Sequence, residues 1–403
     1  MALFDRFAPV LAARARVRGD DPFGVRMDRI LSPTEAIVRG RPVLLAGTNN
    51  YLGLTFDPDC IAAARNALER LGTGTTGSSI ANGSYAGHKD LEAALADFYG
   101  REHAMVFSTG YQANLGIIST LAGPQDYLLI DADCHASIYD ACRMGSATVI
   151  RFRHNDAADL DRRLRRLADH PGNKIVVVEG IYSMLGDQAP LAEIAEVKTR
   201  HGAYLIVDEA HSLGVLGRRG RGLAEAAGVE DAADFVVGTF SKSLGAVGGF
   251  CVSNHPEFEI LRVVSRPYMF TASLPPSVIA SVRKALEIVA TRPELRTRLW
   301  ALSNHFYDRL TRHGFQLGPQ KGPVVAVHLP DVPTALAVWQ ELLDAGVYVN
   351  MALPPATPTN QPLLRCSVCA AHTAEQLDRI TDLLTDVAYE VGMFEQPARV
   401  AVG

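Results

Sequence analysis

The chain has 403 residues, of which 48% are hydrophobic and 21% are charged, and its formal net charge is −5. This length suggests two or three structural units in an ordinary globular protein. The near-neutral charge lacks the basic stripe that nucleic-acid binding requires, so we expect no nucleic-acid partner. Apolar runs are only strand-length, so we expect no membrane-spanning helix and at most peripheral contact with a membrane.

The N-terminal sequence and the cysteines indicate a cytoplasmic protein. Residues 1–18 mix charges with short apolar stretches and lack the long apolar core of a secretory leader. Six cysteines without such a leader suggest a reducing compartment. Cys366 and Cys369 form a lone C-x-x-C pair with no second ligand pair nearby. We therefore expect structural thiols there and no metal site.

The first two regions in chain order are an N-terminal arm and a large domain. Residues 1–45 predict the arm, with a short strand pair punctuated by turn residues. From residue 46 to 275, β-rich apolar runs alternate with helical patterns, which is typical of a sheet buried on both faces. The expected strands are 104–107, 127–130, 148–152, 175–179, 205–207, 235–237 and 250–253, and the expected helices are 91–99, 112–121, 156–167 and 191–201. This succession predicts an α/β fold with a mainly parallel sheet and helices on both faces.

Residues 276–403 predict a smaller α+β C-terminal domain. A long helical pattern at 277–313 opens it. The expected strands are 324–329, 347–350 and 363–368, and the expected helices are 334–345 and 373–391. The segment 353–362 holds four prolines, which indicates an ordered loop or a surface connection.

Chemistry is expected where strands end, because open α/β sheets bind ligands outside the carboxyl ends of their strands. The strand 205–207 ends in Asp208, and a buried carboxylate there needs a cationic partner. A protonated pyridine nitrogen is such a partner, and an acidic residue keeps that ring protonated. Two alternatives remain for this segment: Asp208 caps the next helix, or it binds magnesium with Glu209. No P-loop accompanies the pair to support the magnesium interpretation.

Lys242 follows the strand 235–237 within a run of hydroxyls and glycines. Lysine forms imines with carbonyl cofactors when its neighbours lower its pKa. Small residues allow a cofactor to approach closely, and hydroxyls bind phosphate. A structural lysine at a strand end is the alternative, although such a lysine more often lies among charges in solvent. Asp208 on another strand end favours the Schiff-base interpretation.

Two more strand ends carry candidate site residues. After the strand 104–107, residues 108–114 form a small turn and a helix start, where backbone N–H groups and the helix dipole favour a phosphate. Many βα turns share this pattern. After the strand 127–130 comes His135, whose imidazole could stack on a flat ring or serve only as a structural residue.

Together these features resemble the fold-type I pyridoxal-phosphate (PLP) enzymes, and specifically the α-oxoamine synthase family. The matching stretches cover nearly the whole chain. They are 47–58, 107–116, 133–140, 151–155, 179–187, 207–212, 238–243, 266–276, 354–358 and 364–367. The lysine and aspartate motifs are typical of the superfamily, whereas 151–155 and 354–358 favour a narrower group that uses long acyl chains.

The resemblance implies a role for each matched residue. It implies that Lys242 carries PLP as a Schiff base, that Asp208 pairs with the pyridinium nitrogen, and that His211 bonds the phenolic oxygen. His135 would stack on the ring and orient the substrate carboxylate. The residues implied to hold the phosphate are Gly110, Tyr111, Thr239 and Ser241, with Thr271 and Ser273 reaching the phosphate of the partner subunit in a homodimer. The residues implied to line the site or bind substrate are Asn50, Ser183 and Arg365.

One position departs from the family pattern. In a bacterial relative, an arginine directly precedes the Pro-Pro-Ala-Thr-Pro loop, whereas this chain has Leu353 there. If that arginine holds the substrate carboxylate, this chain must use Arg365, His135 or another group, because a planar bidentate donor suits a carboxylate.

The resemblance also implies a reaction. The expected activity is the decarboxylative condensation of L-serine with a long-chain acyl thioester, palmitoyl-CoA or an acyl-carrier-protein thioester. The products are 3-ketodihydrosphingosine, CO2 and the free thiol, which is the first step of sphingolipid synthesis. The nearest alternatives pair glycine with acetyl-CoA or alanine with pimeloyl-CoA. Two others are a non-catalytic partner subunit, against which Lys242 argues, and a nucleotide-binding module, for which no phosphate-loop motif is present.

Overall fold

The computed structural model describes residues 3–8, 19–358 and 360–394 of the chain. The described residues form two compact units, Asn49–Ala301 and the combination of Met1–Thr48 with Leu302–Gly403. The sequence had suggested boundaries at 45/46 and 275/276. The later division has a physical reason: helix α11 (Pro276–Thr291) packs on α2 (Pro58–Leu71) and α3 (Ala86–Tyr99) and so belongs to the larger unit. The prediction of an N-terminal arm and the expectation of no secretory leader concern, in part, residues 1–2 and 9–18. These lie outside the described residues.

The larger unit is built on a seven-stranded sheet with the order β4-β10-β9-β8-β7-β5-β6. Its strands are β4 (His103–Phe107), β5 (Tyr127–Asp131), β6 (Thr148–Phe152), β7 (Lys174–Glu179), β8 (Tyr204–Asp208), β9 (Phe235–Thr239) and β10 (Gly249–Ser253). Only β10 runs against its neighbours, pairing antiparallel with both β4 and β9. The prediction of a mainly parallel sheet is therefore confirmed.

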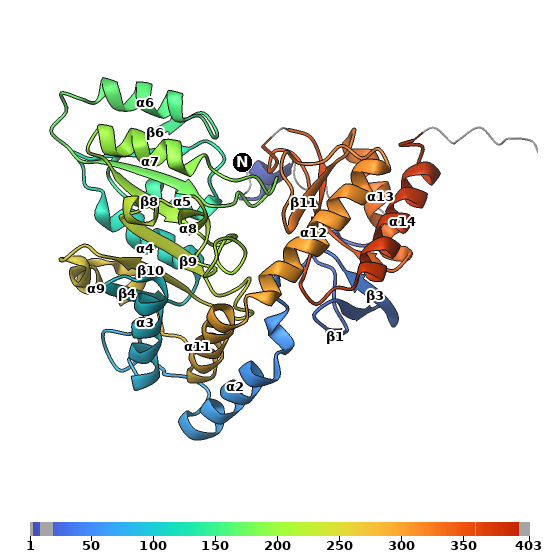
Figure 1. Cartoon of the computed structure of the whole chain (residues 1–403), viewed down its shortest axis with the longest axis horizontal. Helices are drawn as coiled ribbons and strands as arrows, with labels where there is room; N and C mark the ends of the chain where they lie inside the picture. The colour runs from blue at the N-terminus through green and yellow to red at the C-terminus, as the bar shows by residue number, and fades with distance from the viewer. Residues whose placement is uncertain (1–2, 9–18, 359, 395–403) are drawn as a thin grey trace, which may run out of the picture. The chain divides into compact units, whose positions relative to one another are not determined.

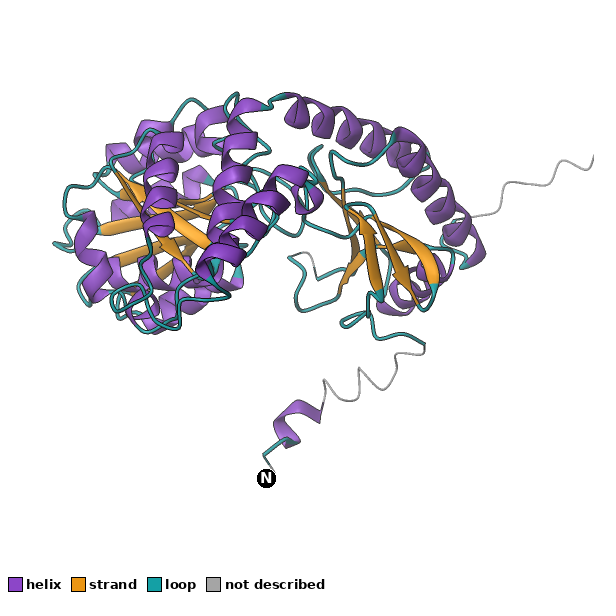
Figure 2. Cartoon of the chain, turned by 90° about the horizontal axis from the view of Figure 1, so that it is seen from below, coloured by secondary structure: helices purple, strands orange, loops and turns teal. Residues whose placement is uncertain are grey.

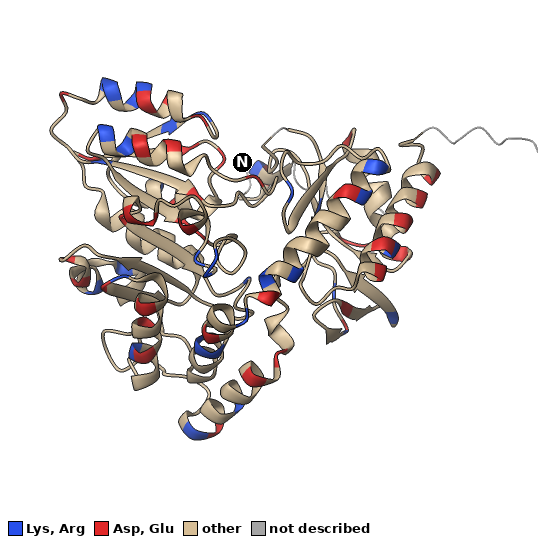
Figure 3. Cartoon of the chain, in the orientation of Figure 1, with Lys and Arg blue, Asp and Glu red and all other residues tan. Residues whose placement is uncertain are grey.

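Helices cover both faces of this sheet (Figures 1 and 2). Helices α4 (Gly110–Leu121) and α5 (Ala136–Met144) pack against each other, and so do α6 (Ala157–Arg166) and α7 (Leu191–Arg200). The central strands are buried on both sides, which is why their sequences are continuous apolar runs. Helix α6 carries both acidic and basic residues (Figure 3), with two aspartates in its first half and four arginines toward its C-terminus, the order that the helix dipole favours. The short elements of this unit are η2 (Leu54–Phe56), α8 (Leu223–Ala226), η3 (Glu230–Ala232), η4 (Phe258–Ile260), α9 (Leu261–Val264) and α10 (Arg266–Met269).

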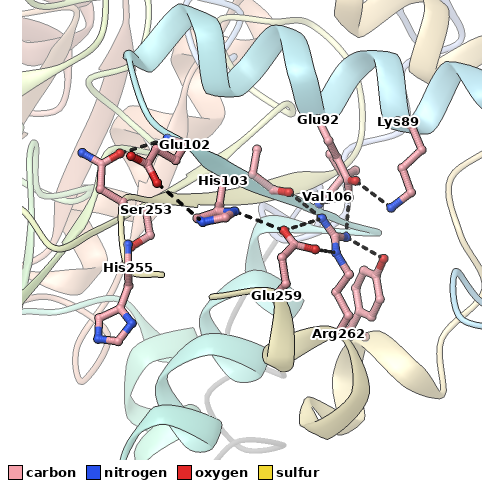
Figure 4. Close-up of polar contacts among 12 residues, drawn as sticks. Lys89, Glu92, Glu102, His103, Val106, Ser253, His255, Glu259 and Arg262 are labelled. Atoms are coloured by element: carbon pink, nitrogen blue, oxygen red, sulfur yellow. Dashed lines mark hydrogen bonds and ion pairs between the residues drawn. The ribbon is translucent and has the colours of Figure 1, made fainter. Parts of the chain in front are cut away.

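An ion-pair cluster around Arg262 joins β4 to the segment η4–α9 (Figure 4). The Arg262 guanidinium donates to Glu92 Oε1 at 2.8 Å, to Glu259 Oε2 at 2.6 Å and to the backbone oxygen of Ala104 at 2.8 Å. Glu92 also accepts from the backbone N–H of Val106 at 3.2 Å. Burial disfavours the guanidinium charge, but Glu259 and Glu92 outweigh it and raise the pKa of Arg262.

The smaller unit contains two sheets. One has the order β1-β2-β3-β12 and the other the order β11-β14-β13. Their strands are β1 (Arg29–Ser32), β2 (Glu35–Val38), β3 (Arg41–Leu45), β11 (Val324–His328), β12 (Val347–Tyr348), β13 (Asn350–Ala352) and β14 (Leu363–Ser367), and the helical elements are η1 (Asp5–Phe7), α13 (Val332–Asp344) and α14 (Ala374–Glu390). The predicted N-terminal strand pair is thus three strands, and the predicted strand 347–350 is divided between the two sheets.

The predicted single helix 277–313 is wrong. Helix α11 ends at Thr291, and α12 (Glu294–Arg312) begins after Pro293. Proline has no N–H to donate and disfavours the helical conformation of the residue before it, and Arg292 has φ −118° and ψ 67°. The apolar period continues through the break, which is why periodicity alone suggested one helix.

Two expectations about composition can be compared with the described residues. Cys366 and Cys369 are buried, and burial raises the pKa of the Cys366 thiol to about 12. No helix within the described ranges is both long enough and apolar enough to cross a bilayer.

Candidate active site

A cavity of about 260 Å³ opens at the carboxyl ends of the parallel strands in the larger unit. Residues that follow β4, β5, β8 and β9 meet there, as expected for an open α/β sheet. The predicted site residues that line the cavity are Gly110, Tyr111, His135, Asp208, His211, Thr239, Ser241 and Lys242. Residues between 109 and 242 in the sequence are therefore brought to one place.

Asp208 ends β8 and is 5% exposed. Its Oδ1 accepts from the backbone N–H of Ala210 at 2.9 Å, and its Oδ2 accepts from Nδ2 of Asn114 at 2.7 Å. A turn follows Asp208 rather than a helix, so the helix-capping interpretation is wrong. The carboxylate is held in one orientation by donors from two different elements.

Glu209 does not share a ligand set with Asp208. Its carboxylate accepts from the backbone N–H groups of Leu223 at 2.9 Å and Ala224 at 2.8 Å, and from the hydroxyl of Ser212. Burial raises the pKa of Glu209 to about 7. Across the described residues, no group of three or more His, Cys, Asp or Glu side chains is placed to hold a metal ion. The magnesium interpretation therefore has no support in the geometry.

The N-terminus of α4 provides a cradle for an anion. Thr109 caps the helix, its Oγ1 accepting from the backbone N–H of Gln112 at 3.0 Å. A Cβ on Gly110 would lie 2.7 Å from Cβ of Thr239, so only glycine fits at this close approach. The hydroxyls of Thr239 and Ser241 lie 2.8 Å apart on the same side. Backbone N–H groups, hydroxyls and the helix dipole form the donor set that suits a phosphate.

His135 caps the N-terminus of α5 and lines the cavity. Its backbone N–H donates to Oε1 of Glu179, a fully buried residue at the end of β7. The ring of Tyr111 stands edge-on to that of His135, with the centroids 6.4 Å apart. Loss of solvent lowers the pKa of His135 and outweighs the Asp208 carboxylate, which acts in the opposite direction, so the balance favours the neutral imidazole.

His154 does not line the cavity but bonds to the segments that lead to it. His154 donates from Nδ1 to Asp131 at 2.8 Å and from Nε2 to Asp187 at 2.7 Å. Asn155 supports the same carboxylates, with its backbone N–H 2.9 Å from Asp131 and its side chain 2.8 Å from Asp187. Asp131 also accepts from the backbone N–H of Asp133, in the loop that leads to His135. This network ties together the segments that follow β5, β6 and β7.

Five of the predicted residues lie outside the cavity lining of the described chain. One of them, Ser273, has its hydroxyl 2.7 Å from that of Thr75. Asn50 donates to Thr55 Oγ1 at 2.7 Å, and Thr271 accepts from Gln112 at 3.1 Å. Ser183 is half-buried in the loop after β7. Arg365 is buried in β14 of the smaller unit, where it donates to Ser367 at 3.2 Å. The roles of these five residues stay predictions.

The structure adds lining residues that the sequence did not single out. These are Thr109, Asn114, Ser137, Glu179, Ala210 and Gly238. Asn114 had a signal in the sequence, because it occupies the apolar face of its helix, three residues before Ile117 and four before Ile118. A polar residue at such a position must find partners in the interior. Tyr51 was also missed, and its hydroxyl lies 2.7 Å from Nδ1 of His211.

The residues present fit PLP. The cradle at Gly110 suits its phosphate, the buried Asp208 carboxylate suits a pyridinium nitrogen, and Lys242 offers an amine in the same cavity. Neutral His135 offers a flat ring on the cavity wall. Each part of the cofactor thus has a complementary group in this cavity.

The chain belongs to the aminotransferase class I and II family, whose model matches residues 41–384. Over 397 residues it is 59% identical to the serine palmitoyltransferase of Caulobacter vibrioides, covering 98% of each protein. Among solved structures, it resembles the Sphingomonas wittichii serine palmitoyltransferase with a TM-score of 0.95 and 53% identity, covering 98% of this chain and all of that one. A variant of the S. paucimobilis serine palmitoyltransferase with a bound PLP–myriocin aldimine matches with a TM-score of 0.96 and 51% identity over the same shares. These findings bear out the resemblance read from the sequence.

Proposed function

We propose that this chain is a PLP-dependent enzyme that condenses L-serine with a long-chain acyl thioester, palmitoyl-CoA in the first instance. The observation that carries the proposal is the placement of Lys242, Asp208 and the Gly110 cradle in one cavity. The high identity to serine palmitoyltransferases over almost the whole chain supports the choice of substrates. The products are 3-ketodihydrosphingosine, CO2 and coenzyme A.

The side chains divide the work of the reaction. When bound, PLP withdraws electrons from the α-carbon of the amino acid. Lys242 supplies the amine that holds the cofactor and then removes the proton from the α-carbon of serine. Asp208 provides the negative charge that keeps the ring nitrogen protonated. The α-carbon attacks the acyl carbonyl and the thiolate of coenzyme A leaves. The carboxylate then departs as CO2, and Lys242 returns a proton to the electron pair left on the α-carbon.

The substrate carboxylate requires a donor from this chain. We propose Arg365, because a guanidinium binds a carboxylate through two parallel hydrogen bonds. His135 is the second candidate, since a neutral imidazole still donates from one nitrogen. Leu353 stands where a relative has an arginine, so this chain depends more on these two residues.

The proposal includes the assembly and the location of the enzyme. We propose a homodimer in which Thr271 and Ser273 reach the phosphate held by the partner subunit. We also propose a cytoplasmic enzyme with at most peripheral membrane contact. Gel filtration with light scattering tests the first of these, and a monomer that turns over at the full rate would contradict it.

A substrate panel tests the proposed reaction. Purified holoenzyme is given serine, glycine or alanine together with palmitoyl, acetyl or pimeloyl thioesters of coenzyme A, and palmitoyl-acyl carrier protein is a further donor. Release of free thiol and of CO2 from carboxyl-labelled amino acid is measured. We expect serine with a palmitoyl thioester to give the highest kcat/KM. Preference for glycine with acetyl-CoA, or for alanine with pimeloyl-CoA, would overturn the proposal.

A further inference from the structure

A continuous chain of hydrogen bonds connects Asp208 to His135 through two buried side chains that carry no assigned role. Nδ2 of Asn114 lies 2.7 Å from Oδ2 of Asp208 and 2.9 Å from Oγ of Ser137. The same hydroxyl lies 2.8 Å from Nδ1 of His135. Asn114 is 2% exposed and Ser137 is 1% exposed, so water does not compete for these bonds.

In this series of hydrogen bonds, the Asp208 carboxylate determines which atom donates in each bond. An ionised carboxylate only accepts hydrogen bonds, so the atom of Asn114 that faces Asp208 must be the amide nitrogen. A flipped amide would bring two acceptor oxygens to 2.7 Å. The two hydrogens of Nδ2 then go to Asp208 and to Ser137. With its lone pair engaged by Asn114, the Ser137 hydroxyl has its own proton free for Nδ1 of His135.

A second donor confirms that Nδ1 of His135 is an acceptor. The backbone N–H of Ser137 donates to the same nitrogen at 3.2 Å, as part of the cap of α5. A nitrogen that accepts hydrogen bonds carries no proton, so the proton of the neutral ring is on Nε2. Loss of solvent, which lowers the pKa of His135, keeps the ring in this neutral form.

We infer that Asn114 is a positioning residue that, through Ser137, couples the Asp208 carboxylate to His135 and holds His135 as the Nε2–H tautomer. Asn114 aims one oxygen of Asp208, the group proposed to pair with the ring nitrogen of the cofactor. The same amide sets which nitrogen of His135 can donate. The consequence is a donor N–H on the cavity wall, ready for an anionic group such as the carboxylate of the amino-acid substrate. The catalytic part of this inference rests on the proposed function, whereas the tautomer does not.

The first test measures the tautomer in the full-length holoenzyme by ¹⁵N-histidine NMR at pH 7.5. The chain has 12 histidines, and a His135→Gln protein identifies the signal of His135. We expect a protonated Nε2 and an unprotonated Nδ1 in the wild type. In Asn114→Leu, which removes both donors at similar volume, and in Ser137→Ala, the backbone N–H of residue 137 still donates to Nδ1. We therefore expect the fraction of the Nδ1–H tautomer to rise severalfold while the Nε2–H tautomer stays the larger, because one of the two hydrogen bonds to Nδ1 is weakened or lost. A wild-type His135 with its proton on Nδ1, or variants with an unchanged tautomer, would overturn the inference.

The second test uses kinetics to separate the effect on Asp208 from the effect on His135, the two ends of the series of hydrogen bonds. Ser137→Ala leaves the bond from Asn114 to Asp208 in place, so we expect a higher KM for serine with a nearly unchanged kcat. Asn114→Leu loosens both ends, so we expect kcat to fall about 10- to 100-fold in addition. Equal effects of both variants on kcat would contradict the assignment of Asn114 to Asp208.

Ser119→Ala is the matched control. Ser119 lies on α4, the helix of Asn114. Among the contacts of the described residues, its hydroxyl bonds only within that helix, to the backbone oxygen of Leu115. We expect wild-type kinetics and a wild-type His135 signal from this protein. If Asn114→Leu does not fold, Ser137→Ala still decides the tautomer. If no serine turnover is found but the tautomer shifts as stated, the proposed function fails and the positioning by Asn114 stands.

Discussion

Nε2 of His154 donates to Oδ2 of Asp187 across 2.7 Å, which closes the loop after β7 onto the turn after β6. Its other nitrogen donates to Asp131, so both nitrogens carry protons and the ring is an imidazolium. Burial opposes this charge, but the two carboxylates outweigh it and raise the pKa of His154 to about 10. A histidine of this kind is a permanent cation at physiological pH rather than a switch.

The raised pKa of His154 predicts a pH-dependent contribution to stability. The contribution is complete below the unfolded pKa of 6.5 and is lost as the pH rises through the folded pKa of about 10. Between these pH values the native state holds a proton that the unfolded state has lost. The stabilising contribution of His154 to the free energy of unfolding therefore falls by about 1.4 kcal/mol for each unit by which the pH rises. Urea unfolding of the wild type and of His154→Gln at several pH values from 6 to 10 checks this. We expect the difference between the two proteins to shrink steadily with pH, and a difference that stays constant would contradict the assignment.

Replacement of Lys242 by alanine tests the centre of the site. Without the amine, we expect the protein to lose the absorbance band of the lysine-bound cofactor and to turn over at least about 10³-fold more slowly. Circular dichroism establishes that the variant is folded. Turnover within tenfold of the wild type would show that another residue removes the proton.

The close approach of Gly110 to Thr239 predicts a sharp effect of one methyl group. In Gly110→Ala, the new Cβ would lie 2.7 Å from Cβ of Thr239, so the cradle must open. We expect PLP affinity to fall at least about tenfold, which corresponds to the loss of one charge-assisted hydrogen bond. Gly74→Ala is the matched control, because a Cβ on Gly74 has nothing within 4 Å. Cofactor retained after dialysis is the measured quantity, and equal retention by both variants would refute the role of the cradle.

The Arg262 cluster of Figure 4 predicts a loss of stability without a loss of chemistry. Arg262→Met leaves Glu92, whose side chain is 9% exposed, without its guanidinium partner. We expect the free energy of unfolding to fall by about 2 kcal/mol, because Glu92 loses a charged hydrogen-bond donor while Lys89, whose Nζ lies 2.9 Å from Oε2 of Glu92, still offsets part of its charge. Adding Glu92→Gln removes that charge and restores part of the loss, whereas purely additive losses in the double variant would contradict this explanation. Turnover per folded molecule stays at the wild-type value in both proteins.

Much of the fold and of the site could be predicted from local patterns. The strands of the larger unit are continuous apolar runs, and Lys242 and Asp208 stand directly after two of them. The errors came where local patterns conflict. The apolar period runs across Pro293, but the missing N–H ends the helix there. The run 347–350 has the composition of one strand, yet its two halves pair with β3 and with β14 in different sheets.

The sequence by itself determined which residues end strands and which chemical groups stand there, because burial and turn formation depend on near neighbours in the chain. The tertiary structure alone decided which of those ends meet. Asn114 and Asp208 are 94 residues apart, and no local pattern relates them. Their contact depends on the strand order and on the packing of α4 against the sheet, both of which are set by hydrogen bonds and side-chain contacts between distant segments. The chain of bonds from Asp208 to His135 is therefore a property of the fold rather than of any motif.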